Sequence, residues 1–237
     1  MLLQLPCPPM NSFPRSPASE GVAPSLVIEY FFDLVCPWCL IGKRHLRAAI
    51  SQLAALRPDA RVSVRWRSHQ LLPDIPPGGV PYQSFYIARL GSAEAVAQRR
   101  AQVQQAGNPA CIQFAFERIG VMPNTAAAHD LSAWAAANGT EAQQSALIES
   151  LFVAYFMEGE DIGDPSVLQR RALACGLEAE GLRQHLAKTA GQTGIMRAPQ
   201  ADYISGVPFF VLNGKYAISG AHPPETLVQA MLQSIQE

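Results

Sequence analysis

The stretch Cys36-Pro37-Trp38-Cys39 places two thiols three residues apart, directly after the apolar run 26–32. Residues 40–56 follow, with apolar side chains at helical spacing among basic and polar ones. Pro37 suits the first helical turn, because the N–H that it lacks would have no partner within the helix. The pattern predicts a strand followed by a helix, with both cysteines where the helix begins.

Two cysteines at the start of a helix are suited to thiol–disulfide exchange. The free N–H groups and the dipole at a helix N-terminus favour a negative sulfur at Cys36. A thiolate attacks a substrate disulfide to form a mixed disulfide, and it is also a good leaving group when that intermediate resolves. Cys39 lies one turn later and faces the same way, so we expect it to be the resolving thiol. The same steps in reverse would donate a disulfide.

A zinc site is the main structural alternative for this pair, but zinc needs a second pair of cysteine or histidine ligands. No histidine pair has the required spacing, and the other cysteines are isolated: Cys7, Cys111 and Cys175. We therefore expect no metal and no resident cofactor. The three isolated cysteines are interpreted as free thiols, with Cys111 and Cys175 as small core residues.

A second element lies near the C-terminus. Two apolar runs, 207–212 and 216–218, are joined through Asn213-Gly214, the residue pair preferred in a type I′ turn. Pro208 stands at the start of the first run, where a strand tolerates a residue without an N–H donor. The pattern predicts a β-hairpin.

These phrases together resemble the DsbA branch of the thioredoxin superfamily, and within it the FrnE-like subfamily. The similar phrases are Asp33 to Lys43, Asn124 to His129, Gly206 to Val211 and Ile218 to Glu225. The resemblance runs from about Leu26 to the C-terminus. It implies an α/β thioredoxin-like fold with a large all-helical insertion. It also implies a cis peptide at Val207-Pro208 beside the cysteines, where the Val207 backbone would bind a substrate strand.

The chain divides into three parts on this interpretation. Residues 1–24 are rich in proline and serine without periodicity, so we expect a disordered tail. Residues 25–75 and 204–237 are expected to form the thioredoxin-like domain, in which the alternating run 61–67 completes a βαβ unit. Residues 76–203 have helical patterns almost throughout and would interrupt that domain.

Helices in the insertion are expected to begin at Ser92, Thr140 and Asp164, which are N-capping residue types. The insertion is interpreted either as a lid or groove wall above the cysteines or as inert bulk. Loops and insertions carry specificity more often than the scaffold does.

Four further residues are site candidates. Pro37 and Trp38, between the two thiols, are expected to contact substrate. Asp33 is a candidate for tuning proton transfer at Cys39, although an aspartate after a strand is commonly a turn residue. His129, within a phrase of the resemblance, is a candidate for facing the catalytic cleft, although a histidine on such a helix is more commonly a surface or core residue.

Composition limits the partners and the compartment. The chain has 237 residues with a formal net charge of −1, which argues against a nucleic-acid surface. No apolar run approaches the roughly 18 residues that cross a membrane, and prolines interrupt the first 25 residues, which lack a basic leader. We therefore expect a cytoplasmic protein with a transient catalytic disulfide. Its oligomeric state is left open.

The leading hypothesis is a thiol–disulfide oxidoreductase acting on disulfide-containing proteins or small thiols, with glutathione or thioredoxin as cellular reductant. The alternative is a glutathione-dependent enzyme of the 2-hydroxychromene-2-carboxylate isomerase or kappa-class transferase type, which needs no second cysteine. A third is a holdase that binds unfolded chains. Retention of both thiols favours redox chemistry. The motif leaves the direction of electron flow open, since potentials run from about −270 mV for thioredoxin to about −120 mV for DsbA.

Overall fold

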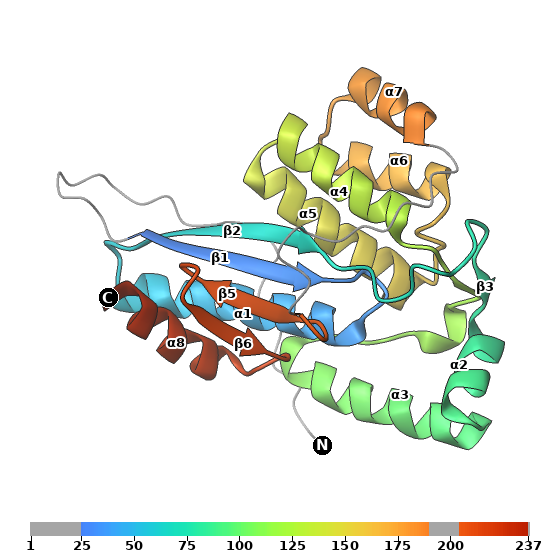
Figure 1. Cartoon of the computed structure of the whole chain (residues 1–237), viewed down its shortest axis with the longest axis horizontal. Helices are drawn as coiled ribbons and strands as arrows, with labels where there is room; N and C mark the ends of the chain where they lie inside the picture. The colour runs from blue at the N-terminus through green and yellow to red at the C-terminus, as the bar shows by residue number, and fades with distance from the viewer. Residues whose placement is uncertain (1–24, 190–203, 237) are drawn as a thin grey trace, which may run out of the picture.

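A four-stranded mixed sheet forms the centre of the protein. The computed structural model describes residues 25–189 and 204–236, and its sheet has the strand order β2-β1-β5-β6 (Figure 1). β1 and β2 are parallel, whereas β5 is antiparallel to β1 and β6 to β5. The strands are β1 (Ser25–Phe32), β2 (Arg61–Ser68), β5 (Phe209–Leu212) and β6 (Tyr216–Ser219).

Two helices lie side by side against one face of this sheet: α1 (Pro37–Leu56), which links β1 to β2, and α8 (Pro224–Gln236) (Figure 1). β1 is the central strand of the core, and its side chains from Tyr30 to Phe32 are fully buried. A parallel pair needs a crossover, and the amphipathic helix α1 provides it. The βαβ unit and the hairpin predicted from the sequence are both confirmed.

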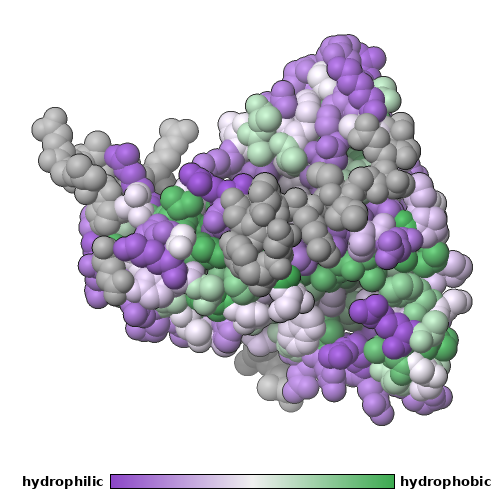
Figure 2. Space-filling view, viewed as in Figure 1, coloured by the Kyte–Doolittle hydropathy of each residue, from purple (hydrophilic) through white to green (hydrophobic). Residues whose placement is uncertain are grey.

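Between β2 and β5, residues 69–189 are mostly helical, and their helices lie in two groups beside the sheet (Figure 1). One group comprises α2 (Tyr82–Leu90) and α3 (Ala93–Gly107). The other comprises α4 (Ala126–Asn138), α5 (Glu141–Val153), α6 (Pro165–Ala174) and α7 (Ala179–Thr189). Apolar residues gather where the two groups meet, while α3 and α7 are mainly hydrophilic (Figure 2). No helix in the described part of the chain has the length and apolar character that a membrane crossing requires.

The predicted helix starts are found where local chemistry sets them. The Ser92 hydroxyl accepts a hydrogen bond of 3.1 Å from the backbone of Ala95. Thr140 forms a capping box with Gln143, and the Asp164 carboxylate accepts from the backbone of Ser166. Each side chain satisfies an N–H group that has no partner within its helix. The expected fold, an α/β thioredoxin-like domain with a large helical insertion, is confirmed.

The insertion is not helical throughout, which corrects one expectation. β3 (Val80–Pro81) pairs antiparallel with β4 (Val121–Met122), and a π-helical turn, η3 (Ala154–Glu158), extends α5. Short 3₁₀ turns occur at η1 (Asn108–Ala110) and η2 (Phe116–Arg118). A strand of two residues has no alternation that a sequence pattern could reveal. The tail predicted at 1–24 lies outside the described residues, and the three domain limits stay predictions.

A buried ion network joins α1 to α5. Glu149 accepts hydrogen bonds from Lys43 Nζ at 2.9 Å and from Arg44 Nε at 3.0 Å. Burial alone would raise the pKa of Glu149, but the two cations outweigh it and hold the pKa at about 2. Arg44 also donates to the backbone carbonyls of Ala110 and Cys111. The network therefore holds the insertion against the helix that begins at Cys36 and Cys39.

Replacing Glu149 with glutamine is expected to lower the free energy of unfolding by about 3–5 kcal/mol, because Lys43 would stay buried without its carboxylate. Urea unfolding at neutral pH measures this. Since the pKa of Glu149 falls from 4.5 to about 2 on folding, its contribution is complete above pH 4.5 and disappears as the pH falls towards 2. The variant and the wild type should therefore converge in acid.

The matched control is Asp59→Asn, which breaks the exposed pair between Arg57 and Asp59. That change should be much smaller, because water screens exposed charges. Equal effects of the two substitutions would contradict the role assigned to Glu149.

Candidate active site

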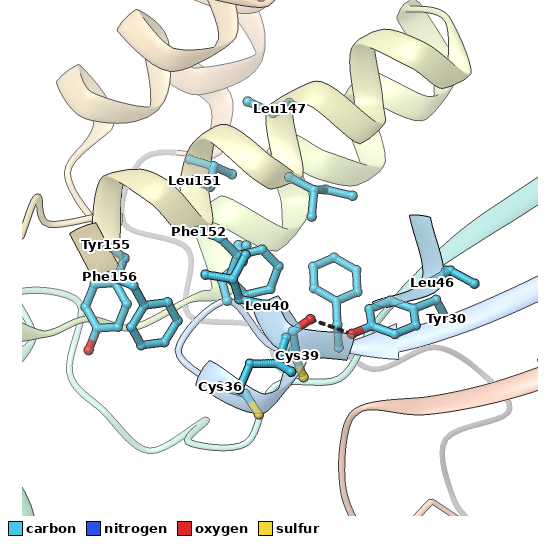
Figure 3. Close-up of a cluster of buried hydrophobic side chains, with 14 of the residues drawn as sticks. Tyr30, Cys36, Cys39, Leu40, Leu46, Leu147, Leu151, Phe152, Tyr155 and Phe156 are labelled. Carbon is cyan, nitrogen blue, oxygen red and sulfur yellow. Dashed lines mark hydrogen bonds between the residues drawn. The ribbon is translucent and has the colours of Figure 1, made fainter. Parts of the chain in front are cut away.

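The two cysteines occupy the first turn of α1, and both are reduced. Cys36 is the N-cap residue, and Cys39 follows one turn later with its sulfur on the same side (Figure 3). The backbone N–H of Cys36 donates to the Asp33 carbonyl at 3.1 Å, which closes the turn between β1 and α1. Cys36 is 6% exposed, whereas Cys39 is completely buried. An incoming sulfur therefore meets Cys36 first.

Burial governs the chemistry of Cys39. It raises the pKa of this thiol well above the ordinary value. The hydrogen bond with Cys36 and the charge of Cys36 raise the pKa further. A hydrogen bond from the Asp33 backbone acts in the opposite direction. The Cys39 thiol therefore keeps its proton at neutral pH and needs an acceptor before it can attack.

The second predicted element lies directly beside the first. The Val207–Pro208 peptide bond is cis, and the Cys36 thiol donates to the Val207 carbonyl with an Sγ–O distance of 3.6 Å. These two residues are separated by 171 positions in the chain. The structure thus brings the cysteine pair and the proline-led strand together, with the backbone of half-buried Val207 next to the more exposed sulfur.

Gly42, which was not among the expected site residues, makes this approach possible. A Cβ at this position would lie 3.1 Å from Pro208 Cγ and 3.0 Å from the Tyr30 hydroxyl. A glycine inside a helix costs about 1 kcal/mol relative to alanine, so its presence one turn after Cys39 was an available signal of a close contact.

Two tyrosines near the thiols were also missed. The Tyr30 hydroxyl donates to the Cys39 carbonyl at 2.6 Å (Figure 3), and burial raises the pKa of Tyr30 well above its usual value, so the donor keeps its proton. Burial also raises the pKa of Tyr86 on α2, and the charge of Cys36 adds to this shift. α2 therefore borders the site. Tyr30 follows the alternation of β1, but nothing local in the sequence marks either tyrosine as a neighbour of the thiols.

Asp33 and His129 form a buried pair behind the thiols. His129 Nε2 lies 3.0 Å from Asp33 Oδ1, and neither side chain is exposed. Asp33 Oδ2 accepts a hydrogen bond of 2.7 Å from the backbone of Leu71. His129 Nδ1 has no hydrogen-bond partner within the described part of the chain. Of the positions considered for His129, the cleft, the surface and the core, the structure shows the core, because α4 packs it against Asp33 and the ring of Phe32.

Pro37 and Trp38 are half-buried in the first turn of α1, and Trp38 packs against the core. Their expected contact with substrate stays a prediction. Among residues 25–189 and 204–236, no group of acidic, histidine or cysteine side chains could hold a metal ion.

Of the isolated cysteines, Cys111 differs from the free core thiol that the sequence predicted. Cys175 is a free, half-buried thiol, but Cys111 is exposed and disulfide-bonded, which corrects its interpretation as a free core residue. Isolated cysteines give no indication of pairing in the sequence, because pairing depends on the fold. Cys7 lies outside the described residues.

Comparison with solved structures identifies the same architecture in several proteins. A probable DsbA oxidoreductase from Streptomyces coelicolor is 27% identical with a TM-score of 0.75, over 90% of this chain and 91% of that one. The cytosolic disulfide reductase DsbM from Pseudomonas aeruginosa with GSH is 16% identical with a TM-score of 0.56, over 89% and 96%. A 2-hydroxychromene-2-carboxylate isomerase is 16% identical with a TM-score of 0.58, over 87% and 95%.

A search of curated proteins finds no match. The sequence profile of the DSBA-like thioredoxin domain matches residues 27–232, which include both cysteines, the helical insertion and the hairpin. This span covers nearly the whole chain and agrees with the strand order and the helical insertion described above. The protein therefore belongs to the family of DSBA-like thioredoxin domains.

Proposed function

We propose that this protein is a thiol–disulfide oxidoreductase, with Cys36 as nucleophile and Cys39 as resolving thiol. The observation that carries the proposal is the difference between the two sulfurs. Cys36 caps α1 beside Val207 and is partly exposed, whereas Cys39 is fully buried directly behind it. A nucleophile must reach its substrate, while a resolving thiol needs to reach only the mixed disulfide.

The reduction of a substrate then runs in two exchanges. The Cys36 thiolate attacks one substrate sulfur, the substrate S–S bond breaks, and the other substrate sulfur leaves and takes up a proton. Cys39 then loses its proton and attacks Cys36, which releases the second substrate sulfur. Two electrons pass from the enzyme to the substrate, and the Cys36–Cys39 disulfide remains. Glutathione or thioredoxin would reduce it again.

Val207 and Pro208 would position the substrate. An extended segment hydrogen-bonds to the Val207 backbone beside Cys36, in the manner of an added β-strand. Pro37 and Trp38, half-buried in the first turn of α1, would contact the substrate as well. Two large apolar side chains are exposed: Leu71, whose backbone N–H donates to Asp33, and Ile87, next to Tyr86 on α2. An apolar disulfide-containing segment fits such surroundings.

The buried pair Asp33–His129 would receive the proton that Cys39 releases. The backbone of Asp33 is hydrogen-bonded to Cys39, and the Asp33 carboxylate is hydrogen-bonded to the imidazole of His129. This pair lies on the buried side of the thiols, where bulk water does not reach. The assignment makes these residues tuning groups for the resolving step.

The setting proposed for this reaction is the cytoplasm. In the same proposal, the protein belongs to the FrnE-like subfamily. It has no resident cofactor and uses glutathione as a co-substrate. The fold shared with a cytosolic disulfide reductase whose structure contains GSH is compatible with it. A glutathione-dependent isomerase is the second candidate, because an isomerase has the same fold.

Parallel assays test the two candidates. The full chain is tested for insulin reduction with glutathione and for isomerisation of 2-hydroxychromene-2-carboxylate, each with wild type and Cys39→Ser. We expect insulin reduction that depends on Cys39. Isomerisation that survives Cys39→Ser, without any insulin reduction, would reverse the assignment. Suppression of aggregation that survives removal of both thiols, without either enzyme activity, would support a holdase.

A further inference from the structure

A cavity of about 450 Å³ lies among α1, β2 and the first turns of α5. Its walls are mainly apolar and include Leu46, Ile50, Val62, Val64 and Trp66. Cys36, Cys39 and Pro208 are not among its lining residues. Cavities of roughly 300–1,000 Å³ hold small organic ligands in other proteins. This one is therefore large enough for a ligand and is separate from the redox site.

The cavity exists because β2 is an edge strand that α1 covers incompletely. Val62, Val64 and Trp66 on β2 are half-buried, whereas their neighbours on β1 are completely buried: Leu26, Ile28 and Tyr30. Ile50 on the facing side of α1 is half-buried as well. Apolar surface left open in this way favours an apolar occupant, because removing that surface from water is favourable.

Charge at the rim of the cavity selects the kind of occupant. Arg47 on α1 and Arg61 on β2 line it, both exposed, and neither guanidinium has an ion-pair or hydrogen-bond partner in the described part of the chain. Lys43, which also lines it, is already paired with Glu149. Glu141 is the one acidic side chain among the lining residues. The unpaired positive charges therefore exceed the negative.

We propose that this cavity binds a small organic anion with an apolar body, such as a carboxylate or sulfonate. Its acidic head is held at the rim by Arg47 and Arg61, since guanidinium groups bind such heads with paired hydrogen bonds. Its hydrocarbon or aromatic body lies against Trp66 and Val64. A neutral molecule leaves the arginines without a partner, and a cation is repelled.

Fluorescence titration of the full chain with 1-anilinonaphthalene-8-sulfonate tests the proposal. We expect saturable binding that 1-naphthoate or decanoate displaces, and the better competitor indicates whether the site prefers an aromatic or an alkyl body. Arg47→Gln should weaken binding by about tenfold, the usual cost of losing one charged hydrogen bond. Ala142→Trp, at an exposed lining position on α5, should fill the cavity and abolish binding.

Arg65→Gln is the matched control, because Arg65 is an exposed arginine of the same strand that does not line the cavity. Its affinity should equal that of the wild type. Insulin reduction by all variants should be unchanged, which separates this site from the redox site. Equal affinities of Arg47→Gln and Arg65→Gln, binding that persists in Ala142→Trp, or 1-naphthalenemethanol competing as well as 1-naphthoate would overturn the proposal.

Discussion

Cys36→Ser is expected to lower disulfide-exchange turnover by at least about a thousandfold, because it removes the sulfur of the cysteine pair that a substrate can reach. Serine is nearly the same size but does not form a thiolate or a disulfide. Insulin reduction with glutathione as the electron donor measures the loss. Circular dichroism should show an unchanged fold, since the Cys36 side chain makes no capping hydrogen bond to α1.

Cys39→Ser should behave differently from Cys36→Ser. The first exchange still occurs, so substrates should accumulate as mixed disulfides on Cys36, because the resolving thiol is missing. Mass spectrometry of covalent adducts, recovered without reductant, measures this and also identifies the substrates. Cys175→Ser is the matched control, since it removes a free thiol outside the site. Normal multiple turnover by Cys39→Ser would refute the assigned order.

Asp33→Asn is expected to slow the resolving step by about a hundredfold near neutral pH, within the usual range for a lost proton acceptor. The reason is that the pKa of Cys39 is raised by burial and by Cys36, so its thiolate does not form readily without a neighbouring base. His129→Gln should slow the same step, because it removes the partner 3.0 Å from the Asp33 carboxylate. Stopped-flow decay of a preformed mixed disulfide measures this step directly.

The pH dependence separates a proton acceptor from a merely structural residue. A raised pKa means that the Cys39 thiolate becomes more abundant as the pH rises, so the defect of Asp33→Asn should shrink in alkaline solution. Asp33→Glu should restore part of the rate. The first attack by Cys36 should be unaffected. A slowdown that is the same at every pH, or that affects both steps equally, would contradict the proton-transfer role.

Asp33 and His129 show that a sequence pattern can identify site residues one by one but does not predict which of them will be in contact. Each was identified separately, one from its place before the cysteines and one from a family phrase. Their contact joins residues 96 positions apart, and it depends on how α4 packs against β1. For that reason the sequence left both the cleft and the core open as positions for His129, and only the packing of α4 assigns it to the core. Gly42 was overlooked although a glycine inside a helix is visible in the sequence.

Local chemistry alone determined the order of strand, cysteine pair and helix, the hairpin at Asn213-Gly214 and the caps at Ser92 and Thr140. Such features depend on hydrogen bonds and backbone preferences within a few residues, so they can be predicted from the chain itself.

The contact between Val207 and Cys36 was expected from the family resemblance, but only the tertiary structure decided that Asp33 meets His129 and that an arginine-rimmed cavity opens beside β2. These contacts arise because burying apolar surface brings together segments that are distant in the chain, and burial is non-directional. The pattern of one segment therefore does not specify which residues of another segment it will meet.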